Sequence, residues 1–113
     1  MYKIIRPADQ QRTPSGTVRF EGAFYGSGAS FFHVNNEPGM GSSLHQHPYP
    51  ETWIVRAGKV RFTVGNEEIE AGAGDVVVAA ANTPHKFLNI GTGPLELICI
   101  HPSPQIIQED LEM

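Results

Sequence analysis

The sequence predicts an all-β protein, a small antiparallel barrel or jelly roll, and three observations support this. The 113 residues include 12 glycines and nine prolines, a heavy load for helices. Runs rich in Val, Ile, Phe and Thr recur between turn residues at the roughly 8–12-residue spacing of sandwiches and barrels. Nothing in the middle of the chain has the length and 3.6-residue period of a helix. Many short strands closing on themselves account for this pattern.

The expected strands follow from these runs in chain order. Residues 3–5 are read as a short leading strand followed by a loop, and residues 18–25 and 30–35 as the next two strands. Residues 52–56 and 60–64 come next, and Gly65-Asn66 predicts a hairpin turn into residues 67–70. Val60, Phe62 and Val64 alternate with polar residues and should share one face.

The second half adds three more strands. They are residues 76–78, 85–89 and 95–101. Because Glu96 should face solvent, we expect Leu95, Leu97, Cys99 and His101 to face the interior. Ser103-Pro104 predicts one short helical turn near the C-terminus.

Composition excludes several classes of protein. The net charge is −4 without a Lys or Arg cluster, so we expect no nucleic-acid partner. No apolar run approaches the ~20 residues of a membrane span, and no signal peptide is visible. The length predicts a single domain over residues 1–113. The lone Cys99 fits a reducing, cytoplasmic setting.

Three histidines and one glutamate predict a metal site. His45 and His47 leave the same face of a strand, with Cα atoms about 6–7 Å apart. Glu51 follows the stiff Pro48-Tyr49-Pro50 segment, and closure of the barrel should bring His85 opposite. An isolated His-x-His is often a surface turn, but that reading leaves Glu51 and His85 as coincidence. Burying these groups without a cation would be costly. The donor set is compatible with one divalent Fe, Mn, Ni, Cu or Zn ion.

The two arrays resemble the two sequence motifs of the cupin superfamily. The first is matched at Gly39, His45, His47, Glu51 and Gly58, and the second at Gly74, His85 and Asn89. Ala80 stands where a proline is usual and Asn82 where a glycine is usual, and Asn tolerates the left-handed conformation required there. The resemblance spans about residues 30–102. It implies a small jelly-roll barrel, often dimeric, with His45, His47, Glu51 and His85 as the metal ligands.

Five further residues are candidates for the surroundings of the metal. His101 is a candidate catalytic acid/base or hydrogen-bond donor, against the alternative of a strand-end histidine bonded to backbone. Trp53, Phe87, Tyr49 and His33 are candidate pocket residues. Trp53 could equally be core, Tyr49 could be exposed, and the alternation does not decide whether His33 faces the interior.

These features favour a metal-binding protein that acts on a small organic molecule. Oxygenase chemistry, such as that of a dioxygenase, is the first expectation, because open coordination positions suit O₂ and substrate together. A metal-dependent isomerase or lyase, a binding barrel without turnover, and a purely structural metal site remain as alternatives. The outer sheet surface should carry Ile4, Ile5, Ile54, Ile98 and Ile100, which predicts a homodimer.

Overall fold

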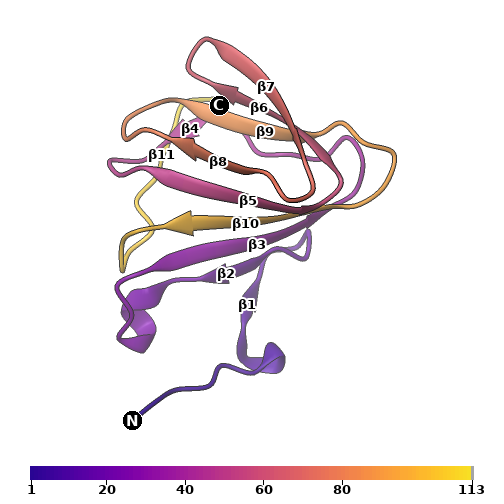
Figure 1. Cartoon of the computed structure of the whole chain (residues 1–113). Helices are drawn as coiled ribbons and strands as arrows, with labels where there is room; N and C mark the ends of the chain where they lie inside the picture. Colours follow the sequence, from indigo (N-terminus) through magenta and orange to yellow (C-terminus); the bar gives the residue numbers. More distant parts are fainter. Residues whose placement is uncertain (113) are drawn as a thin grey trace.

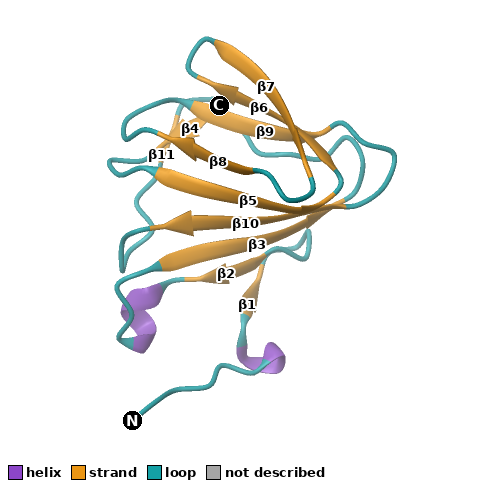
Figure 2. Cartoon of the chain, viewed as in Figure 1, coloured by secondary structure: helices purple, strands orange, loops and turns teal. Residues whose placement is uncertain are grey.

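The computed structural model describes residues 1–112, which form two antiparallel sheets (Figures 1 and 2). One sheet has six strands in the order β1-β2-β3-β10-β5-β8, and the other has five in the order β11-β4-β9-β6-β7. Consecutive strands therefore often lie in different sheets, and the chain crosses between them. This two-sheet, all-β architecture confirms the predicted jelly roll.

The first sheet contains the longest strands. Its members are β1 (Gln11–Arg12), β2 (Val18–Phe20), β3 (Ser30–Asn36), β5 (Glu51–Ala57), β8 (Val76–Ala79) and β10 (Leu95–His101). Strand β10 lies between β3 and β5 and pairs with both along its length. Along β10 every second residue is buried, from Leu95 to His101, as the alternation predicted.

The second sheet closes the other side of the sandwich. It comprises β4 (His45–Gln46), β6 (Lys59–Val64), β7 (Glu67–Gly72), β9 (His85–Asn89) and β11 (Glu109–Asp110). The predicted hairpin is confirmed, with Val64 opposite Glu67 across the turn. Val60 and Phe62 are fully buried and Val64 packs against the same core.

The hydrophobic core lies between the sheets at one end of the sandwich. The largest buried aromatic side chains, Trp53 and Phe62, stack across it with ring centroids 4.5 Å apart. Leu95, Leu97 and Val55 complete this packed end, each at most 1% exposed. The polar residues of the candidate site lie beyond Trp53, so the core provides a rigid floor for them.

Two positions require the left-handed backbone conformation. Gly58, between β5 and β6, has φ +90°, and a Cβ there would lie 2.6 Å from the carbonyl oxygen of Pro94. Asn82 has φ 58°, the only positive value among the described non-glycine residues. The expectation that Asn replaces a glycine in this turn is confirmed.

Three expected elements are wrong. Residues 3–5 form no strand; the chain enters through a 3-10 helix, η1 (Pro7–Asp9), and then β1. The strand expected over residues 18–25 stops at Phe20, and a second 3-10 helix, η2 (Gly22–Tyr25), follows. Instead of a helical turn at residues 103–104, residues 102–105 form bends, and the segment then leads to β11, which pairs with β4. The Ser103 and Pro104 carbonyls accept from Ser30 Oγ and the Ala23 N–H, so contacts with a distant segment fix the backbone here.

Among residues 1–112, no helix is both long and apolar enough to cross a membrane.

Candidate metal centre

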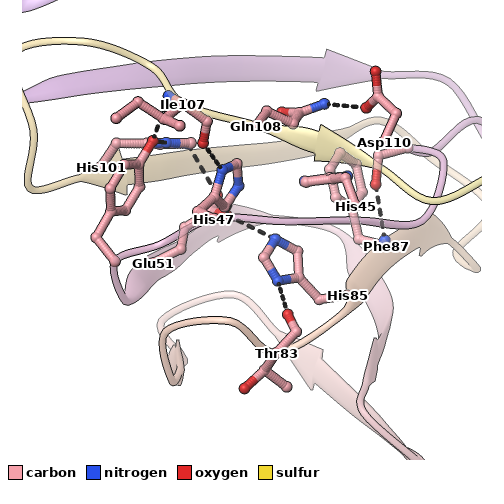
Figure 3. Close-up of polar contacts among 12 residues, drawn as sticks. His45, His47, Glu51, Thr83, His85, Phe87, His101, Ile107, Gln108 and Asp110 are labelled. Atoms are coloured by element: carbon pink, nitrogen blue, oxygen red, sulfur yellow. Dashed lines mark hydrogen bonds and ion pairs between the residues drawn. The ribbon is translucent and has the colours of Figure 1, made fainter.

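The two sheets bring four candidate ligands to one end of the sandwich. His45 opens β4 and His85 opens β9, and the two residues lie directly opposite each other in the antiparallel register. His47 follows β4, and Glu51 opens β5 in the other sheet. In Figure 3 the imidazoles of His47 and His85 and the Glu51 carboxylate point toward one another. The ligands come from distant stretches of the chain, as the sequence predicted.

The distances between the donor atoms suit a single ion. One donor atom from each of the four residues lies within 4.8 Å of all the others. Glu51 Oε1 lies 3.0 Å from Nε2 of both His47 and His85. All four residues are buried, none more than 8% exposed. Atoms about 2.1 Å from a common centre show separations of this order.

Backbone carbonyls fix the tautomer of the three histidine ligands. Nδ1 of His45 lies 2.7 Å from the Ser43 oxygen, and Nδ1 of His85 lies 3.0 Å from the Thr83 oxygen. Nδ1 of His47 lies 2.7 Å from the oxygen of Ile107. A carbonyl only accepts, so each Nδ1 carries the proton and donates it. Each Nε2 is left with a lone pair, and orienting contacts of this kind typify metal-binding histidines.

The donor set fits a cation because the convergent atoms have no donor among the described residues. Nε2 of His47, Oε1 of Glu51 and Nε2 of His85 are buried without a hydrogen-bond partner. Buried polar atoms left unpaired cost free energy, and three acceptors facing each other also repel. A divalent ion removes both costs. Three imidazole nitrogens and a carboxylate oxygen suit Fe, Mn, Ni, Cu or Zn and do not select among them.

The charges of the site are consistent with this assignment. Burial opposes ionisation of Glu51, but contacts with His101, His47 and His85 hold the pKa of its carboxyl well below the usual range. Burial lowers the pKa of His45, which favours the neutral form of this imidazole. For His47, burial is outweighed by contact with Glu51 and the Ile107 carbonyl, and its pKa is raised. A bound cation and a proton on His47 therefore compete for the same carboxylate.

A cavity of about 320 Å³ opens onto the ligands. His45, Glu51 and His101 form its polar end. Its apolar wall consists of Phe32, Val34, Met40, Phe87 and Cys99. Around these lie uncharged hydroxyl and amide side chains: Thr13, Ser15, Thr17, Asn36, Ser42, Ser43 and Gln108. This is enough room for a small organic molecule beside the metal position.

Three candidate pocket residues lie near the ligands. His101 is 1% exposed, lines the cavity, and has Nε2 3.4 Å from Glu51 Oε2. Tyr49 stacks on His47, with ring centroids 5.2 Å apart, and its hydroxyl lies 2.6 Å from His101 Nδ1. Phe87 lines the cavity wall. Tyr49 is half-buried between two exposed prolines, Pro48 and Pro50.

Two other candidates lie elsewhere. Trp53 forms part of the core: it stacks on Phe62 and meets the His85 ring edge-on at 5.0 Å, so it supports a ligand from behind. His33 lies on the outer face of β3, away from the cavity, where its Nε2 is 3.0 Å from Glu96 of β10. Phe32 and Val34, its neighbours along β3, are the residues that line the cavity.

The C-terminal segment contributes groups that the sequence did not indicate. The Ile107 carbonyl orients His47, and the side chain of Gln108 lines the cavity. Pairing of Glu109–Asp110 with β4 holds this segment beside the ligands. A backbone carbonyl has no sequence signature, and no residue pattern in residues 103–112 indicates it.

Solved structures of other proteins share the fold of this chain. The tryptophan-to-tyrosine variant of Bacillus subtilis oxalate decarboxylase superposes with a TM-score of 0.84 at 25% identity, over 94% of this chain and 31% of that enzyme. Another structure of the same enzyme, described by its Mn(II) centres, gives a TM-score of 0.80 at 24% identity, over 89% and 29% of the two chains.

Proteins of two other organisms are also similar to this chain. The Lactobacillus farciminis oxalate decarboxylase–formate complex gives a TM-score of 0.78 at 23% identity, over 90% of this chain and 33% of that one. An uncharacterized protein of Methanocaldococcus jannaschii is 34% identical over 76 residues, which are 66% of this chain and 60% of that protein. The chain thus spans about a third of the enzymes and 60% of this relative. The family model for the cupin domain matches residues 32–101, more than half of the sequence, and the chain belongs to the cupin superfamily.

Proposed function

We propose that this protein is a metal-dependent enzyme that acts on a small organic molecule by oxygenase-type chemistry. One observation carries the proposal: the cavity of about 320 Å³ opens directly onto Glu51 and His45 of the ligand set. A redox-active divalent metal held by four protein ligands would supply open coordination positions for O₂ and substrate together. A purely structural site would need no such cavity.

The residues of the chain have separable tasks in this proposal. His45, His47, Glu51 and His85 hold the metal, and the carbonyls behind the histidines keep their Nε2 atoms directed at it. The apolar wall of the cavity excludes water from the reacting molecule. His101 lies within the lining, where its imidazole can hold a proton near bound substrate.

The lining also indicates the substrate class. Among the described residues that line the cavity, none is Lys or Arg, and Glu51 is the only acidic residue. An anionic substrate would have no guanidinium or ammonium partner apart from the metal. Five apolar side chains and the hydroxyl and amide groups favour an uncharged molecule with an apolar body. The oxalate decarboxylases are named for a dianion, so their substrate is not carried over to this chain.

A metal-dependent isomerase or lyase is the second candidate, and His101 favours it. In such reactions the metal polarises an oxygen of the substrate and a nearby acid/base group moves a proton. His101 lines the cavity, where an imidazole proton on Nε2, 3.4 Å from Glu51 Oε2, is available for such a transfer. One measurement distinguishes the oxygenase from the isomerase or lyase, because only the oxygenase consumes O₂.

The test begins with protein purified without exposure to affinity metals. Elemental analysis gives the resident metal, and oxygen consumption is then followed with a panel of small diketones, thiols and catechols. We expect about one metal per chain, and O₂ uptake with at least one neutral panel member. Metal without O₂ uptake, but with chemical conversion of a panel compound, supports the isomerase or lyase. Metal without any conversion supports a non-catalytic binding barrel.

A matched pair of variants separates the site from the rest of the protein. His85→Ala removes one of the four ligands, whereas His33→Ala removes a histidine of the outer face of β3. We expect His85→Ala to lose most of its metal and all activity, and His33→Ala to keep both. Equal metal content in the two variants contradicts the assignment of the ligands.

We also propose that the protein forms a homodimer through the outer face of the six-stranded sheet. Ile54, Ile98 and Ile100 lie half-buried on that face, and Val76 and Val78 of β8 are 60% and 62% exposed. Continuous apolar surface of this kind favours association. Light scattering at micromolar concentration should give twice the mass of the chain, and a monomer mass contradicts the proposal.

A reducing, cytoplasmic location for this single barrel domain is proposed from its one cysteine. Cys99 is the one cysteine of the sequence, so it cannot form an internal disulfide, and at 3% exposure it is shielded from the thiols of other molecules. Cell fractionation with an antibody tests the location, and recovery from a secreted fraction contradicts it.

A further inference from the structure

The two oxygens of the Glu51 carboxylate have different surroundings. Oε1 faces Nε2 of His47 and of His85, whereas Oε2 lies 3.4 Å from Nε2 of His101. Oε1 is buried without a hydrogen-bond partner among the described residues, and it is the oxygen that joins the ligand set. Oε2 contacts His101, which is not one of the four ligands.

A chain of contacts sets the direction in which His101 donates. The backbone N–H of Ile107 donates to the Tyr49 hydroxyl oxygen at 3.2 Å. The Glu51 carboxylate only accepts, so a neutral His101 imidazole carries its proton on Nε2, 3.4 Å from Oε2. Nδ1 is then the acceptor, and the Tyr49 hydroxyl, 2.6 Å away, donates to it. Ile107, Tyr49, His101 and Glu51 thus form a directed relay.

We propose that Tyr49 and His101 are positioning residues for the metal ligand Glu51. A carboxylate that can offer either oxygen, or both, to a metal gains a single orientation when one oxygen is occupied by a fixed N–H donor. His101 would hold Oε2 and so leave Oε1 as the single coordinating oxygen, which preserves open positions on the metal. The stacking of Tyr49 on His47 places the relay against a second ligand.

The backbone of Ile107 links the relay to the rest of the site. Its N–H donates to Tyr49, and its carbonyl accepts from Nδ1 of His47. The backbone of one residue thereby orients two of the four ligands, one directly and one through Tyr49 and His101. Pairing of β11 with β4 holds this segment in place.

This inference rests on the proposed metal centre but not on turnover, so the test uses metal alone. Mn²⁺ binding is measured by titration, and the coordination of the bound ion by electron paramagnetic resonance. Tyr49→Phe removes the hydroxyl and keeps the ring on His47; His101→Ala removes the donor; His101→Gln offers an amide that can accept from Tyr49 and donate to Glu51. Tyr25→Phe, at a tyrosine stacked on Phe20 outside the site, is the control.

We expect Mn²⁺ affinity to fall about 10-fold in Tyr49→Phe and about 100-fold in His101→Ala, with altered spectra in both. His101→Gln should recover most of the affinity and the original spectrum, and Tyr25→Phe should match the wild type. If His101→Ala does not fold, as judged by circular dichroism, Tyr49→Phe decides. The inference is overturned if Tyr49→Phe keeps the Mn²⁺ affinity and spectrum of the wild type. It is also overturned if His101→Gln binds Mn²⁺ no more tightly than a folded His101→Ala. A wild-type protein that binds no Mn²⁺ or other divalent ion refutes the metal centre itself.

Discussion

Replacing Glu51 with glutamine should stabilise the metal-free protein while abolishing its metal binding. The glutamine amide nitrogen can take the place of Oε1, 3.0 Å from Nε2 of both His47 and His85. Its two N–H groups then face two lone pairs that lack a donor among residues 1–112. The amide oxygen takes the place of Oε2 and accepts from His101. Every convergent polar atom gains a partner without a buried charge.

The size of the gain follows from the number of new hydrogen bonds. Two buried bonds at about 1 kcal/mol each raise the free energy of unfolding by about 2 kcal/mol. For a chain of this length, that gain corresponds to a rise in Tm of about 8 °C. The variant should not bind a divalent ion, because an amide is a much weaker ligand than a carboxylate and its N–H groups point at the metal position.

The stability advantage of metal-free Glu51→Gln over the metal-free wild type should grow as pH rises. In the wild type, contact with Glu51 raises the pKa of His47 above its unfolded value, so this pair stabilises the folded state fully below about pH 6.5. That contribution disappears as pH rises through the folded pKa of His47. Glu51→Gln lacks the ion pair, so its stability should depend less on pH over this range. The difference between variant and wild type is therefore larger at pH 9 than at pH 6.

Urea denaturation of chelator-treated proteins at several pH values provides the measurement. Glu96→Gln is the matched control, because it changes the other described Glu–His pair, at half-exposed positions with His33, and should alter stability by less than about 0.5 kcal/mol. A Glu51→Gln variant that is less stable than the metal-free wild type throughout this pH range, or that binds metal with unchanged affinity, refutes the tautomer assignment.

Three further outcomes test the site and the fold. A divalent metal present at 100 times its Kd should raise stability by about 2.7 kcal/mol, and excess chelator should lower Tm by about 11 °C in calorimetry. Bound metal should be released below about pH 6, because protons compete with the metal for the imidazole nitrogens. Dialysis at this pH followed by elemental analysis measures the release, and metal that stays with the protein contradicts the prediction. Gly58→Ala should lower the free energy of unfolding by about 3 kcal/mol, because the added methyl group both strains the backbone and approaches the Pro94 oxygen too closely. Gly16→Ala is the control, because Gly16 also has a positive φ (+89°) but no atom near its Cβ position, so only the backbone strain of about 1 kcal/mol is expected. Urea denaturation measures both.

Strands with a buried and an exposed face were predictable from the sequence alone. Along β10, Leu95 to His101 alternate with residues that are only partly buried, and this period of two specifies both the strand and its orientation. The Gly65-Asn66 turn specifies the β6–β7 register in the same way. The close approach of His45, His47, Glu51 and His85 was foreseen because these residue types have few other reasons to be buried together.

The sequence was uninformative where long-range pairing decides the structure. Residues 3–5 are apolar enough for a strand, yet they pair with no strand, and Ile4 stays 56% exposed. Glu109 and Asp110 have low strand propensity, yet they pair with Gln46 and His45 because that edge is free. The orientation of His33 could not be fixed, since Phe31 to Asn35 contains apolar residues on both faces.

The three ligand histidines illustrate how a fold can specify a tautomer with and without a local signal. His45 and His85 each open a strand after a loop, and each donates Nδ1–H to the carbonyl two residues earlier. A carbonyl at that point lies outside the strand it precedes, so it is free to accept a proton from the imidazole. His47 follows its strand and has no such neighbour to use; it depends on Ile107, 60 residues away. Two ligands are therefore oriented by the same segments that carry them, and the third only after the C-terminal segment has docked.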